Sequence, residues 1–217
     1  MSISRMVLVP GIITAAVTLL RLVGELNHWS RTLFNPDAGG GLALVGIAWL
    51  VPIFGIYFAM KLPASSRTGS GWRPLGFAAL AIGVFIGIVF AVPAVMGLDP
   101  SQPGFAAFAV MIVASLIALA VAYYGSGALG RVLIAYGLAA RIPVILVMLL
   151  AILGNWGTHY DVLPPGAPEM GVWTKWLVIG VVPQLTLWIA FTVAVGGLFG
   201  GVALVIAERR RTAPHPA

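Results

Sequence analysis

The sequence predicts an all-α integral membrane protein, because of its composition and its apolar runs. Of the 217 residues, 60% are hydrophobic and only 8% are charged, and the mean hydropathy is +1.05. A water-exposed surface of ordinary charge density cannot be built from such a chain. Apolar runs long enough to cross a hydrocarbon layer of roughly 30 Å recur along the whole sequence. Helices are favoured over a β-barrel because short alternating segments are not seen.

The apolar runs predict six transmembrane helices arranged as three helical hairpins. The expected spans are 6–27, 41–61, 75–97, 104–124, 132–155 and 175–205. They form a single transmembrane domain over 1–211, followed by a short polar tail at 212–217. The last span is longer than a bilayer requires, and Pro183 is expected to kink it. The first run continues into Arg21 and Glu25 without a small-residue cleavage site, so we expect an uncleaved helix.

Basic residues predict the orientation of these spans. Most of them fall on one side of a six-span arrangement: Arg5, Lys61, Arg67, Arg73, Arg131, Arg141, Arg209, Arg210 and Arg211. The positive-inside rule therefore places both termini in the cytoplasm. The formal net charge of +6 follows from this topology, so we expect no nucleic-acid binding. The absence of cysteine excludes disulfides and thiolate metal sites, which suits a multi-pass protein of a bacterial inner (cytoplasmic) membrane.

Arg21 and Glu25 are the first candidate polar site. They lie four residues apart on one helix face, toward the outer end of the first span, so their side chains can pair. Ionisable residues inside a membrane are functional candidates because they must face a cavity or a polar partner. A structural ion pair that fixes helix packing is the other interpretation, as is an arginine that extends to the interface.

A second group of polar residues stands where the first and fifth spans end. It consists of His28, Asn155, His159 and Asp161. Neighbouring helices could bring His28, His159 and Asp161 to Glu25 as a proton-handling or metal-binding cluster. Their spacing matches no metal motif, so we predict no metal and no cofactor apart from bound lipid. Helix capping and loop anchoring explain the same residues without any ligand.

Gln184 and two sets of glycines complete the candidates. Gln184 follows Pro183 inside the last span and could share a polar spot with a carbonyl that the proline leaves free. The small-residue pairs are Gly83 with Gly87, Gly196 with Gly200, and Gly197 with Gly201. Such pairs let helix backbones approach closely, either inside one subunit or in a homo-oligomer.

Three functions stay open, since no residue pattern indicates a particular family. The first is a noncatalytic polytopic protein, an accessory or scaffolding subunit of a membrane assembly or a homo-oligomer, with the bilayer and other membrane proteins as partners. The alternative is a small transporter or channel with an outward-facing polar site at Arg21 and Glu25. The second alternative is an enzyme acting on a lipid or quinone at the outer surface, with His159 or His28 as base. The sparse polar content of the spans favours the first function over an enzyme.

Overall fold

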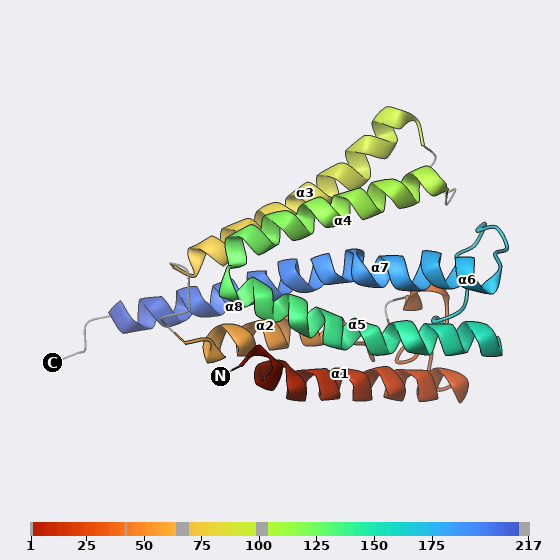
Figure 1. The fold of residues 1–217 in the computed structure, drawn as a ribbon, viewed down its shortest axis with the longest axis horizontal. Helices are drawn as coiled ribbons and strands as arrows, with labels where there is room; N and C mark the ends of the chain where they lie inside the picture. Colours follow the sequence, from red (N-terminus) through yellow and green to blue (C-terminus); the bar gives the residue numbers. More distant parts are fainter. Residues whose placement is uncertain (1, 42, 64–69, 99–103, 213–217) are drawn as a thin grey trace.

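The structure, a computed structural model, describes residues 2–41, 43–63, 70–98 and 104–212, and all regular elements in these ranges are helical (Figure 1). The elements are α1 (Ile3–Leu26), the short η1 (Ala38–Gly40), α2 (Leu50–Lys61), α3 (Trp72–Met96), α4 (Phe105–Ser126), α5 (Ala128–Gly154), α6 (Val172–Lys175), η3 (Trp176–Val181), α7 (Val182–Leu185) and α8 (Leu187–Thr212). Residues 213–217 of the predicted tail lie outside the described residues.

Five segments are long and apolar enough to cross a membrane. They are α1, α3, α4, α5 and the stretch Val172–Arg211, which runs from α6 through α8. The prediction of an all-helical fold is therefore confirmed for the described residues, and the five apolar segments are consistent with a helical membrane protein. The start of α1 and the end of α8 lie at the same end of the bundle (Figure 1).

The predicted helix over 41–61 is wrong in its first part, because α2 begins only at Leu50 and has 12 residues. Such a helix is about 18 Å long, which is shorter than a hydrocarbon layer. The preceding chain forms turns instead. The backbone N–H of Leu44 donates to Thr32 O and that of Val45 donates to Leu33 O, both at 3.1 Å. These contacts hold the segment against the loop after α1 rather than in a helix.

The last membrane segment is interrupted around Pro183. Before the proline, Trp176–Val181 forms a π-helix. After it, Thr186, between α7 and α8, has distorted helical angles of φ −108° and ψ −77°. Its N–H still donates to Val182 O at 3.0 Å and its own carbonyl accepts from Ala190 N–H at 2.9 Å. A proline lacks the N–H that an α-helix needs and crowds the preceding turn, so a local departure from α geometry is expected here.

The bundle is organised around α8, which packs against α2, α3, α4 and α5. Its glycines permit close approach: a methyl group added at Gly200 would lie 2.9 Å from Gly55 O, and one at Gly201 would lie 2.7 Å from the Leu75 nitrogen. Gly83 and Gly87 differ, since nothing lies within 4 Å of an added methyl group there. They belong to α3, which packs along α4 and diverges from α5 and α7 toward its carboxyl end (Figure 1).

Candidate functional site

Glu25 is the centre of a polar cluster at one end of the bundle. This end, which we call the capped end, is where α1 and α5 stop and where the loops 27–49 and 155–171 follow (Figure 1). The Glu25 side chain is fully buried. Its Oε1 accepts a hydrogen bond from Arg21 Nε at 2.8 Å and lies 2.5 Å from His159 Nδ1. Its Oε2 accepts from the backbone N–H of His159 at 2.9 Å.

Arg21 extends the same cluster to the first loop. Its Nη2 donates to Asn35 O at 3.3 Å and to Gly40 O at 3.0 Å. Gly40 has φ +75°, and any side chain there would overlap the Arg21 guanidinium. The cap cluster, as we call Arg21, Glu25 and His159, therefore ties α1 to both loops of the capped end.

Protonation of the loop residues follows from their burial. Burial lowers the pKa of His159 from 6.5, and the hydrogen bond to Glu25 opposes that shift only in part. The ring is therefore neutral at pH 7, with Nδ1–H as the donor to Glu25. Burial also raises the pKa of Tyr160, whose protonated hydroxyl donates to Thr18 O at 3.2 Å.

The remaining predicted residues of this end do not join the cap cluster. Asp161 is buried, but it closes its own turn: Oδ2 accepts from Gly157 N–H at 3.0 Å, and Oδ1 accepts from the Thr158 N–H and hydroxyl at 2.8 and 2.7 Å. His28 and Asn155 are exposed and have positive φ of 52° and 49°. Each follows the carboxyl end of a helix, where such a conformation is common for Asn.

A line of polar contacts continues inward from the cap cluster. Thr14, Thr18, Arg21 and Glu25 share one face of α1 by helical spacing. Thr14 Oγ1 lies 2.9 Å from Tyr136 Oη of α5, while Thr18 O accepts from Tyr160 as described. The line extends about 17 Å from Glu25 to Thr14. It ends there, because the next buried residues of α1 are Pro10, Val7 and Met6.

Arg141 is the polar residue that sequence reasoning misplaced. Counted as a charge near the inner end of its span, it lies instead thirteen residues after the start of α5, about 20 Å along the axis. It is only 4% exposed. Its Nη1 donates to Gln184 Oε1 at 3.3 Å, and its Cζ lies 4.3 Å from the centroid of the Trp188 ring. The signal in the sequence was the uncharged stretch on each side of it, 132–140 and 142–155.

The guanidinium of Arg141 has few partners for its depth. Its Nε is buried and has no hydrogen-bond partner. None of the ion pairs among the described residues includes it. Arg141 therefore carries a charge inside the bundle and pairs with no carboxylate among the described residues. We call Arg141, Gln184 and Trp188 the arginine site.

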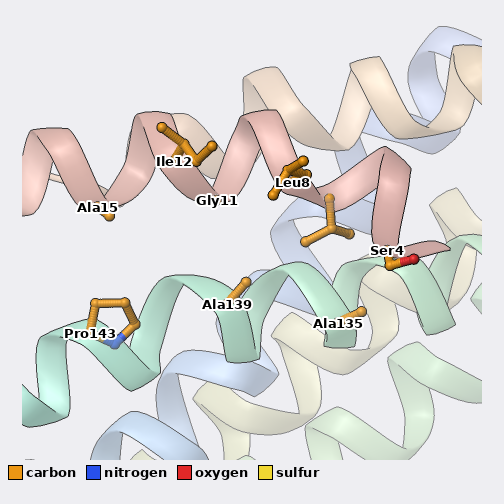
Figure 2. Close-up of a pocket in the computed structure, with 9 residues that line it drawn as sticks. Ser4, Leu8, Gly11, Ile12, Ala15, Ala135, Ala139 and Pro143 are labelled. Atoms are coloured by element: carbon orange, nitrogen blue, oxygen red, sulfur yellow. The ribbon is translucent and has the colours of Figure 1, made fainter.

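An apolar groove lies between α1 and α5, with a volume of about 420 Å³ (Figure 2). Leu8 and Ile12 of α1 and Ala135, Ala139 and Pro143 of α5 contribute to its walls. Arg141 is not among the residues that line it, so the groove and the arginine site are distinct.

Over the residues that the structure describes, the molecule is an all-helical protein with five apolar segments of membrane-crossing length. It has a buried polar cluster at one end and an interior arginine that belongs to none of the ion pairs in these residues. Neither a family model, nor a curated protein, nor a solved structure matches the chain. Within the described ranges, no group of three or more His, Asp or Glu side chains is placed to hold a metal ion.

Proposed function

We propose that this chain is a noncatalytic polytopic protein of a bacterial inner membrane, acting as an accessory or scaffolding subunit of a membrane assembly or as a homo-oligomer. In this proposal six segments cross the layer as three hairpins, and 43–61 is a crossing in which only α2 is helical. The basic residues near the opposite end support a cytoplasmic location for that end and for both termini. The capped end then faces outward.

The hydrogen bonding of Glu25 is the observation that supports a noncatalytic role best. Both carboxylate oxygens are occupied by groups of the same chain, and solvent does not reach the side chain. A carboxylate that binds a substrate or moves protons needs access and exchangeable partners. Here it instead fixes two loops over the helix ends. The result is a rigid outer surface of the kind that a partner protein can recognise without much ordering cost.

The exposed face of α3 supports the association part of the proposal. Gly83 and Gly87 lie on one side of that helix, and the space beside them is open. In membranes, small residues at this spacing allow a second helix to approach closely. We therefore expect a second copy or a partner helix to pack against Gly83 and Gly87.

Native mass spectrometry of the protein, purified in mild detergent from its source membrane, tests this proposal. A homo-oligomer or a stoichiometric partner is the expected species. The double variant Gly83→Ile, Gly87→Ile should shift it to the monomer, whereas Ala120→Ile, at an exposed position of α4, should not. A lone monomer in repeated preparations would refute the proposal. Lipid that copurifies and fits the groove of Figure 2 would support the predicted bound lipid.

A small transporter or channel is the second candidate, and the line of polar contacts between Glu25 and Thr14 favours it. Such a line could form the outer half of a path, although apolar residues follow at Pro10 and below. Proteoliposomes that contain a pH-sensitive dye test this candidate under an imposed pH gradient. Faster decay than in empty liposomes, slowed by Thr14→Val, is expected from a proton path, because this variant removes the hydroxyl that lies beside Tyr136 Oη. Equal decay rates would remove that version of the candidate.

A further inference from the structure

We propose that the arginine site binds the carboxylate of a small amphipathic molecule between α5 and the interrupted segment of α7 and α8. This inference does not depend on the association proposed above, and it concerns residues that the cap cluster does not use. It is drawn from hydrogen-bond donors without acceptors, from charge, from the shape of the guanidinium and from the irregular helix beside it.

Donors exceed acceptors at the arginine site. A guanidinium has five N–H donors, yet Arg141 has one hydrogen bond in the described structure, to Gln184 Oε1 at 3.3 Å. Its Nε is buried without a partner. The amide nitrogen of Gln184 reaches only Met148 Sδ, at 3.8 Å, and a thioether is a weak acceptor. A ligand that satisfies this site must therefore bring acceptor oxygens.

The charge of Arg141 also requires a partner. The residue lies near the middle of a 27-residue helix of membrane-crossing length. Buried charges in proteins are normally paired, and intramembrane arginines usually face a partner or a water-filled path. No ion pair among the described residues includes Arg141. The groups that interact with it electrostatically are the hydroxyls of Tyr136 and Tyr160, and burial raises the pKa of Tyr160 so that its hydroxyl stays neutral. An anion would supply the missing charge.

Shape and surroundings select a carboxylate with an apolar body. The planar fork of a guanidinium matches the two oxygens of a carboxylate, and Trp188 lies over one face of the Arg141 guanidinium. Val144, Ile145 and Met148 are buried apolar residues of α5 around Arg141. A doubly charged or strongly hydrated anion would lose too much solvation at this depth. A single carboxylate on an apolar molecule matches both the unpaired donors and the buried apolar residues beside Arg141 in α5.

The neighbouring helix is irregular beside the arginine site. Gln184 lies between the π-helix of η3 and Thr186, whose φ of −108° and ψ of −77° are distorted from regular α-helical values. Irregular and interrupted helices inside membrane proteins commonly accompany ligand sites. Because long contacts of 3.3 and 3.8 Å hold the Gln184 amide, it can turn aside and let the carboxylate take its place beside Arg141.

Fluorescence quenching by a dibrominated octadecanoic acid tests the proposal on the intact protein in detergent. Bromine quenches tryptophan at short range, and Trp188 touches Arg141, so saturable quenching is expected. Trp188→Phe removes this component from the signal of the seven tryptophans. Arg141→Gln should lower the affinity for the acid by about tenfold or more, because the charge-assisted hydrogen bonds to its carboxylate are lost. Arg131→Gln, at an exposed position of the same helix, should leave binding unchanged.

The methyl ester of the same brominated acid is the decisive control, and it needs no variant. It has the same apolar body but no charge, so weak, unsaturable quenching is expected. Equal quenching by acid and ester would overturn the proposal, because hydrophobic partition would then explain both. Displacement of the acid by millimolar chloride or acetate as readily as by octadecanoic acid would also overturn it, since the site would then accept any small anion.

Discussion

Replacement of Glu25 by glutamine is the sharpest test of how the capped end is held. The variant keeps the size of the side chain but has one acceptor oxygen instead of two. Whichever way the amide turns, its NH2 group faces either the His159 N–H or the Arg21 Nε–H. Arg21, with a side chain only 12% exposed, also loses its counter-charge. Removing one partner of a buried ion pair typically costs about 3–5 kcal/mol, which is the loss of unfolding free energy that we expect.

Titration with SDS of the protein in mild detergent, followed by tryptophan fluorescence, measures that loss. Asp37→Asn is the matched control, because it breaks the Arg31–Asp37 pair, whose side chains are 67% and 62% exposed. An exposed pair contributes only about 0–1 kcal/mol. If Glu25→Gln costs no more than Asp37→Asn, the cap cluster does not stabilise the fold and the reasoning is refuted.

Three further outcomes concern the same end of the bundle. Asp161→Asn removes an acceptor from the turn at Gly157 and Thr158, so amide exchange there should accelerate about tenfold or more; unchanged exchange would contradict this role. Gly40→Ala should lower the unfolding free energy by about 1–3 kcal/mol. Gly39→Ala should lower it by less, because Gly39 has a similar φ but open space around it. Equal effects of the two variants would exclude overlap with Arg21 as the cause. Folding lowers the pKa of His159, so as pH falls below about 6.5 the His159 ring takes up a proton in the unfolded chain before it does so in the folded chain. The free energy of unfolding should therefore fall between about pH 7 and 5. His159→Gln should flatten that dependence, and an unchanged pH profile in the variant would assign it to another group.

The helices were predictable where apolar length alone decides them. The expected spans match α1, α3, α4 and α5 to within a few residues. Each apolar segment by itself must keep its side chains out of water and satisfy its own backbone hydrogen bonds, so its length alone predicts a helix. The start of α2 was not predictable in this way. Its upstream residues are apolar enough for a helix, but contacts of Leu44 and Val45 with the preceding loop hold them in turns. Hydropathy does not record such contacts.

The site was predictable in its residue types and position along the chain, but not in its contacts. Glu25 and His159 both belong to helix ends on one side of the expected topology, yet their hydrogen bond depends on α1 packing beside α5. Arg141 was misplaced for a different reason. The fifth span was expected to start at 132 instead of Ala128, so its depth was underestimated. Which donors find no acceptor is a property of packing alone.

Glu25 and His159 are 134 positions apart in the sequence, so His159 is synthesised well after Glu25. At a synthesis rate of about 5–20 residues per second, roughly 7–27 s pass between the synthesis of Glu25 and that of His159, which hydrogen-bonds to it. During that interval Arg21, one turn away, is the partner within α1 that compensates the carboxylate. We therefore expect the ion pair within α1 to compensate the Glu25 charge before His159 is synthesised, and His159 to add the contact between α1 and the second loop afterwards.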